Sequence, residues 1–175
     1  MRSIALNCRA NTGIASAADY AECRRIMRAA SKNYAFASLV LPPHKRRHVE
    51  ALYAFLRVGD DRVDVSHEGF ASTLAAIEDW EAEYWRAFET GRSAHPVMRA
   101  YLNTACECGI PPETMELYFR AMKDDLAVIR YATFVDLLHY MEGSAIPVGR
   151  AMLYILGVKP PCSPEHAMPY ADSLS

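Results

Sequence analysis

The chain has 175 residues, of which 51% are hydrophobic and 23% charged, and its formal net charge is −2. This length predicts one domain with a buried core, and the near-neutral charge argues against a nucleic-acid partner. No apolar run approaches the roughly 20 residues of a membrane-spanning helix. The first 18 residues lack a secretory signal's apolar segment, and five scattered cysteines form no zinc pattern. We therefore expect a cytoplasmic protein with a flexible leader over 1–18 and a folded domain over 19–175.

Helical patterns follow one another along the chain, and no convincing strand pattern interrupts them. Prolines, and glycines such as Gly91 and Gly109, mark their ends, because proline cannot continue a helix and glycine readily adopts the backbone that closes one. Thr133 and Asp136 form a capping-box pattern that predicts the start of another helix. Pro147 lies inside an apolar helix and predicts a kink there. The predicted helices cover about 17–30, 34–41, 43–64, 68–90, 96–109, 111–125, 133–156 and 163–175. The fold class is therefore all-α.

The helix after Pro43 carries the most informative pattern. Its polar residues recur at spacings of three and four and so share one face: Tyr53, Arg57, Asp60, Asp61 and Asp64. Beside them runs an apolar stripe made of Val49, Leu52, Leu56, Gly59 and Val63. Carboxylates one turn apart in a partly buried site require a cation, and oxygen ligands of this kind suit Mg²⁺ bound to a substrate phosphate. The alternative is an exposed helix end where Arg57 and Asp61 form an ion pair. The apolar helix favours the metal.

Further segments surround this motif in a fixed order. They are Ser31-Lys32-Asn33-Tyr34, Leu41-Pro42-Pro43, Asp124-Asp125 with Arg130-Tyr131 and Thr133-Phe134, and Tyr140-Met141-Glu142-Gly143-Ser144-Ala145. In this order and spacing the segments resemble the squalene/phytoene synthase family, the head-to-head prenyl synthases, over about residues 19–175. The Gly-Ser-Ala sequence is most similar to bacterial phytoene synthases and some bacterial squalene-pathway relatives.

The resemblance implies an isoprenoid-synthase-type helical bundle that joins two allylic diphosphates at their C1 carbons. One substrate loses diphosphate, and the double bond of the other attacks the cation to give a cyclopropylcarbinyl diphosphate. That intermediate ionises, rearranges, and loses a proton or accepts a hydride. We expect conversion of geranylgeranyl diphosphate to phytoene, in carotenoid biosynthesis. The alternatives are squalene or dehydrosqualene synthesis from farnesyl diphosphate, and a non-catalytic helical assembly factor on the same scaffold. Clustered carboxylates favour an enzyme, because a scaffold has no need of them.

The resemblance also implies roles for individual residues. Asp60 and Asp64 would bind Mg²⁺, with Asp61 supporting them, and would thereby assist departure of the diphosphate. The expected diphosphate contacts are Ser31, Lys32, Asn33, Tyr53, Arg57 and Arg130. Asn33 stands where the family commonly has a second serine. Tyr140 would face the carbocation from an opposing helix. For Tyr140 alone core packing would be the default interpretation, and for Arg130 the alternative is a cation that complements a helix C-terminus.

In the resembling family, a second aspartate-rich motif follows on the helix that begins here near Pro164. Asp172 alone does not replace it. We therefore expect the N-terminal portion of a longer enzyme, inactive by itself, with apolar surface exposed on the helix that carries Tyr140. The run His44-Lys45-Arg46-Arg47-His48 predicts a solvated basic face rather than a zinc site, and contact with anionic lipid at a membrane surface is a further possibility.

Overall fold

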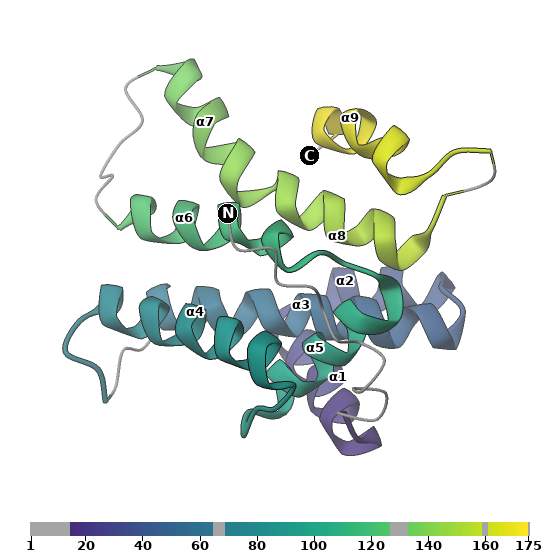
Figure 1. Ribbon diagram of the computed structural model, residues 1–175, viewed down its shortest axis with the longest axis horizontal. Helices are drawn as coiled ribbons and strands as arrows, with labels where there is room; N and C mark the ends of the chain where they lie inside the picture. The colour runs from purple at the N-terminus through teal and green to yellow at the C-terminus, as the bar shows by residue number, and fades with distance from the viewer. Residues whose placement is uncertain (1–14, 65–68, 127–132, 159–160, 175) are drawn as a thin grey trace.

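The computed structural model describes residues 15–64, 69–126, 133–158 and 161–174, and every element within these ranges is helical. The helices are α1 (Ala17–Ala30), α2 (Lys32–Ala37), α3 (Pro43–Asp64), α4 (Thr73–Thr90), α5 (Pro96–Cys108), α6 (Glu116–Asp125), α7 (Phe134–Ser144), α8 (Ile146–Leu156) and α9 (Pro164–Leu174). Short 3₁₀ turns, η2 and η3, cover Ser38–Val40 and Pro112–Met115. The all-α prediction is confirmed. In Figure 1, α1 and α3–α5 lie together in the lower part of the view, α6 and α8 lie above them, α7 slopes down to meet α8, and α9 folds back along α8.

Capping residues explain most of the helix ends. The Ser16 hydroxyl accepts from the Asp19 N–H while the Asp19 carboxylate accepts from the Ser16 N–H, which fixes the start of α1. Thr133 and Asp136 form the same reciprocal pair before α7, as predicted. Gly91 and Gly109 close α4 and α5 with φ of 68° and 72°, a conformation that only glycine adopts without strain.

Proline chemistry accounts for the largest difference from the predicted elements. The kinked helix expected over 133–156 is instead two helices, α7 and α8, that break at Ala145. Pro147 lies in the first turn of α8, where its missing N–H is not needed, whereas within one continuous helix its ring would clash with the carbonyl of Gly143. A second difference has another cause: α4 begins at Thr73 rather than near residue 68, because the Ser72 side chain caps it.

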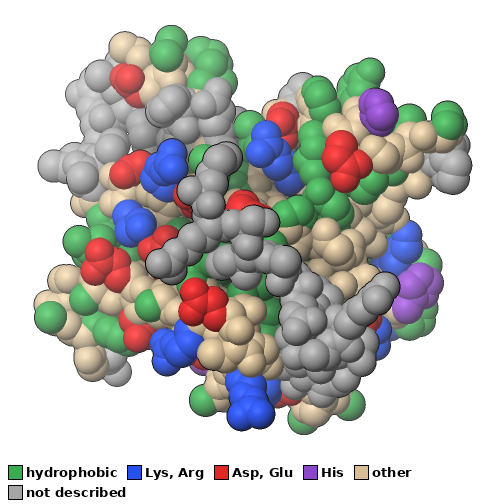
Figure 2. All heavy atoms as spheres, in the orientation of Figure 1, with side chains coloured by type: hydrophobic (Ala, Val, Ile, Leu, Met, Phe, Trp, Pro, Cys, Tyr) green, Lys and Arg blue, Asp and Glu red, His purple; other side chains and the backbone are tan. Residues whose placement is uncertain are grey.

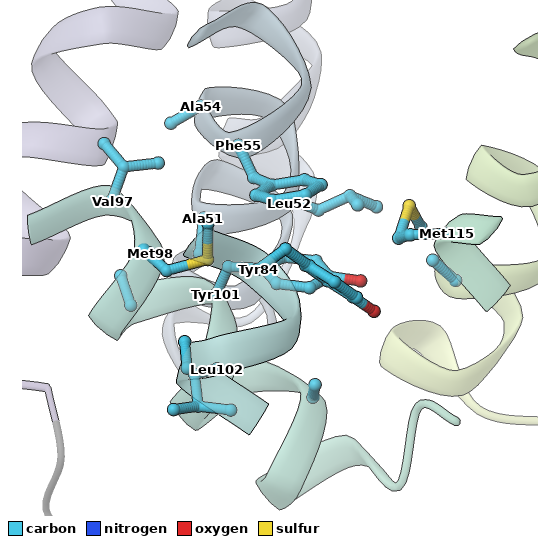
Figure 3. Close-up of a cluster of buried hydrophobic side chains, with 14 of the residues drawn as sticks. Ala51, Leu52, Ala54, Phe55, Tyr84, Val97, Met98, Tyr101, Leu102 and Met115 are labelled. Atoms are coloured by element: carbon cyan, nitrogen blue, oxygen red, sulfur yellow. The ribbon is translucent and has the colours of Figure 1, made fainter. Parts of the chain in front are cut away.

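An aromatic core holds α3 against its neighbours (Figure 3). The Phe55 ring stacks on Tyr101 of α5 at 4.2 Å between centroids, and it also contacts Trp80 and Tyr84 of α4. Tyr84 donates a hydrogen bond of 2.6 Å to the Pro112 carbonyl and thereby links α4 to η3. Such ring pairs contribute about 0.5–1.5 kcal/mol each beyond burial. The rotation of α3 is therefore fixed from several sides.

This packing corrects the predicted apolar stripe of α3. Leu52 and Gly59 are buried, but the other three members of the stripe are only half-buried. The fully buried side is centred instead on Phe55, with Ala51 and Ala54 beside it. The reason is that α1, α4 and α5 all pack on α3 from that direction. The polar face of α3 is consequently left at the edge of the core.

His48 also departs from expectation. His44 is exposed, as predicted, but His48 is only 6% exposed and its Nδ1 lies 3.0 Å from the Thr104 Oγ1 of α5. His48 Nε2 lies 3.3 Å from both the Arg47 Nε and a carboxylate oxygen of Glu107 in α5. His48 thus belongs to the interface between α3 and α5 rather than to a solvated face. None of the described helices is both long and apolar enough to cross a membrane.

Candidate functional site

The polar face of α3 forms the centre of the candidate site. Tyr53, Arg57, Asp60 and Asp61 all lie on this helix and are half-buried. Arg57 Nη2 lies 2.5 Å from Asp61 Oδ1, one helical turn away. The ion pair considered as an alternative from the sequence is therefore present. It engages only part of a guanidinium that carries five N–H donors, so Arg57 can hold a second anion at the same time.

Asp60 is held from across the fold by Tyr118 of α6. The Tyr118 Oη lies 3.3 Å from Asp60 Oδ1 and 3.1 Å from the Leu56 carbonyl, so its single proton is shared between two acceptors on α3. Tyr118 is buried, with 3% of its surface exposed. Its hydroxyl occupies the space beside Gly59, where an added Cβ would lie only 2.3 Å from it. A side chain at position 59 would therefore displace the hydroxyl that contacts Asp60.

The junction of α1 and α2 brings a second segment to this face. Ser31 ends α1, with its N–H donating to the Met27 carbonyl at 2.9 Å, and its hydroxyl accepts from the Tyr34 N–H at 3.3 Å to begin α2. Lys32 therefore starts a second helix rather than ending the first. The Tyr34 ring lies 5.7 Å from the Tyr53 ring, which places the first turn of α2 beside the polar face of α3.

The electrostatics of this face favour donation to an anion. Burial raises the pKa of the Tyr53 phenol, while the Arg57 guanidinium and the Ser31 hydroxyl act in the opposite direction. The phenol therefore keeps its proton at neutral pH and remains a donor. The hydrogen bond to Asp61 raises the pKa of Arg57, which stays cationic. A hydroxyl, a phenol and a guanidinium thus stand together, and a phosphate group would accept from all three.

Other predicted residues are placed less completely. Lys32 and Asn33 are exposed in the first turn of α2. Asp64 is the last residue of α3 and Tyr140 lies in α7, but the description covers neither side chain, and Arg130 lies outside the described residues. The expectation that Tyr140 faces Asp60 therefore stays a prediction.

Two contributors to this site were not anticipated from the sequence. Tyr118 was given no role and Gly59 only a place in the apolar stripe, although a glycine in the middle of a helix next to an aspartate is a signal of close approach by another group. Which side chain makes that approach depends on how α6 packs on α3, and no local pattern specifies it.

The site's fit to Mg²⁺ rests on the chemistry of its donors. Asp60 and Asp61 supply carboxylate oxygens, the ligand type that Mg²⁺ prefers, and few protein ligands leave coordination positions for substrate oxygens. Among the side chains that the structure describes, no group of three or more His, Cys, Asp or Glu is placed to hold a metal ion. Two carboxylates on one helix suit a metal shared with a substrate phosphate rather than one enclosed by protein.

Comparison with known proteins gives a consistent result. The family model "Squalene/phytoene synthase" matches residues 27–175. The chain is 34% identical over 136 residues to the phytoene synthase of Pseudescherichia vulneris, covering 74% of this chain and 44% of that protein. It is 32% identical over 126 residues to the hydroxysqualene synthase of Rhodopseudomonas palustris, covering 72% and 42%. The chain thus spans about half the length of the curated relatives it matches.

Solved structures agree with the sequence relatives. The squalene synthase HpnC from Alicyclobacillus acidocaldarius matches with a TM-score of 0.78 and 31% identity, covering 93% of this chain and 60% of that one. A dehydrosqualene synthase in complex with ligand matches with a TM-score of 0.77 and 25% identity, covering 90% and 52%. The chain therefore belongs to the squalene/phytoene synthase family, whose members condense prenyl diphosphates head to head.

Proposed function

We propose that this chain supplies the diphosphate-binding part of an enzyme that joins two prenyl diphosphates at their C1 carbons. The observation that carries the proposal is the gathering of Tyr53, Arg57 and Asp60 on one half-buried face of α3, with Ser31 brought alongside by the α1–α2 junction. A core helix with clustered carboxylates and donors at the edge of the core suits binding of a metal diphosphate. A purely structural scaffold has no need of that arrangement.

The proposed chemistry assigns a task to each group. Mg²⁺, held by Asp60 and Asp64 with Asp61 in support, would supply positive charge to the departing diphosphate. Arg57 would donate to its oxygens with the part of the guanidinium that Asp61 leaves open, and the Tyr53 phenol and Ser31 hydroxyl would orient it.

The remaining predicted residues complete the proposed site. Lys32, Asn33 and Arg130 would add diphosphate contacts. Tyr140 would stabilise the carbocation that forms when the C1–O bond breaks. The second substrate's double bond then attacks C1 and a proton is lost as the cyclopropane closes. Loss of the second diphosphate, opening of the cyclopropane and loss of another proton would complete phytoene or dehydrosqualene, whereas squalene would require a hydride from a separate donor in place of the proton loss.

Substrate length separates two candidate functions. The phytoene synthase relatives support geranylgeranyl diphosphate as substrate and phytoene as product. Farnesyl diphosphate, leading to squalene or dehydrosqualene, is the second candidate, favoured by the match of 93% of this chain to a squalene synthase structure. The depth of the tunnel that holds the prenyl chain would distinguish the twenty-carbon substrate from the fifteen-carbon one.

Product analysis tests the function directly. A longer protein that includes this chain and spans the full length of its relatives is incubated with Mg²⁺ and either labelled substrate. We expect a head-to-head hydrocarbon or its cyclopropyl precursor from one of them, and no product from either would contradict the proposal. We propose that the 175-residue chain alone is inactive, because ionisation of the diphosphate needs carboxylates on both sides of the metal, whereas Asp60 and Asp61 lie on one helix. Multiple turnovers by the chain alone would overturn that part.

A further inference from the structure

One segment of the chain has a charge unlike the rest. Between Glu22 and Glu50 there are seven Lys and Arg residues and no Asp or Glu, so the chain's net −2 divides into +7 here and −9 elsewhere. The segment covers most of α1, all of α2 and η2, and the first turns of α3. A basic concentration of this kind attracts anionic surfaces even when the whole protein is slightly negative.

The same segment exposes large apolar side chains. Phe36, Leu39 and Val40, which we call the α2 patch, are 76%, 53% and 85% exposed. Their spacing of three and four places them on one side of the α2–η2 unit. Tyr34 is excluded from the patch because its ring packs on Tyr53. The α2 patch thus projects away from the core, whereas Ser38 between its members is buried.

The basic side chains near the α2 patch differ in whether other protein groups already bind them. Arg24 and Arg47 are engaged by Glu50 and Glu107, and Lys45 donates to the Leu156 carbonyl. By contrast, Arg28 and Lys32 are exposed and take part in none of the ion pairs between described residues. Lys32 precedes Phe36 by one helical turn. At the right-hand edge of the face in Figure 2, over the first turns of α3, basic and histidine side chains stand beside hydrophobic ones.

We propose that the α2 patch docks this protein on an anionic lipid bilayer. Phe36, Leu39 and Val40 would enter the headgroup boundary while Arg28 contacts lipid phosphates, the combination by which interfacial helices bind. A second copy of the chain fits less well, because a symmetric contact would set two +7 segments against each other. The purpose of docking rests on the proposed function, since prenyl substrates and hydrocarbon products partition into bilayers. The docking itself can be measured without catalysis.

The test is co-sedimentation of the purified chain with vesicles of phosphatidylglycerol or of phosphatidylcholine alone. We expect binding to the anionic vesicles that weakens with added salt, and little binding to the neutral ones. The variant Phe36→Ser/Val40→Ser should lower the affinity at least tenfold. Arg28→Ala should lower it about fivefold. Phe134→Ser/Val135→Ser is the matched control, because these α7 side chains are 72% and 71% exposed, and it should bind as the unmodified chain does.

Three outcomes would overturn the docking proposal, and a fourth would bear on the proposed function alone. No sedimentation of a chain whose circular dichroism is helical would exclude docking on lipid. Equal losses in the patch and α7 variants would show nonspecific adhesion of apolar surface. If vesicles do not bind but the patch variant changes the oligomeric state, the α2 patch is a contact between proteins. Failure of product formation with intact vesicle binding would refute the proposed function and leave docking standing.

Discussion

At the scale of single residues, the contact of Tyr118 with Asp60 and Gly59 is the most specific feature of the site. The hydroxyl reaches Asp60 only because position 59 has no side chain. Asp60 is thereby oriented by a group on a different helix. Hydrogen bonds of this type hold carboxylates in position, which the proposed metal role of Asp60 requires.

A double-mutant cycle tests this contact. Gly59→Ala should destabilise the chain by about 1–3 kcal/mol through overpacking, reduced by up to about 1 kcal/mol by alanine's better helix propensity. In a Tyr118→Phe background the closest remaining atom is the ring Cζ, 3.3 Å from the added Cβ, so the same change should be nearly neutral. Denaturant unfolding of the four proteins measures the coupling, and additivity within about 0.5 kcal/mol would show that the two positions do not interact.

Replacement of the aspartates tests their individual roles. In an active protein that contains this chain, Asp60→Ala or Asp64→Ala should lower kcat by about 10²–10³-fold, comparable to loss of one electrostatic donor. Asp61→Ala should cost less, because its side chain is rotated about 100° from Asp60 and pairs with Arg57. Steady-state turnover measures all three, and an Asp60→Ala protein as active as the parent would refute the metal role.

At the scale of helices, sequence patterns predicted most elements because their signals are local. The Thr133–Asp136 cap and the glycines at 91 and 109 act within one turn of the chain and were predicted correctly. The separation of α7 from α8 at Ala145 was missed, since continuous apolarity masked the choice between a kink and a break. Features that depend on tertiary contacts could not be predicted from local patterns. The burial of His48 depends on Thr104, 56 residues away.

The His48 contacts between α3 and α5 predict a pH dependence of stability. Burial, followed by the charge of Arg47, lowers the pKa of His48 from its ordinary 6.5, while Glu107 opposes the shift. Below about pH 6.5 the unfolded chain takes up a proton that the folded chain does not, so the stability is present above this pH and is lost as pH falls through the folded pKa.

Unfolding at pH 7.5 and pH 5.5 checks this prediction. The unmodified chain should be less stable at the lower pH, and His48→Gln should reduce that difference without abolishing it, because the pKa of His95 is also lowered by burial. His44→Gln is the matched control, since His44 is exposed on the same helix. An undiminished pH difference in His48→Gln would contradict the account.

At the scale of the whole molecule, the described helices differ in how well their apolar side chains are buried. The aromatic core around Phe55 is fully enclosed, whereas Phe134, Val135, Leu137 and Leu138 of α7 are exposed, as expected for the helix that carries Tyr140. The face proposed to bind diphosphate lies on α3, which α1, α4 and α5 hold in place. The chain should therefore retain that face even without turnover.

Binding of a substrate analogue to this chain tests the central claim most directly. Titration calorimetry with a non-ionising geranylgeranyl thiolodiphosphate should show binding that depends on Mg²⁺ and weakens at least tenfold in Asp60→Asn. Asp124→Asn, an exposed aspartate of α6, should bind as the unmodified chain does. Binding that is independent of Mg²⁺, or equal in the Asp60 and Asp124 variants, would contradict the assignment of α3 as the diphosphate-binding helix.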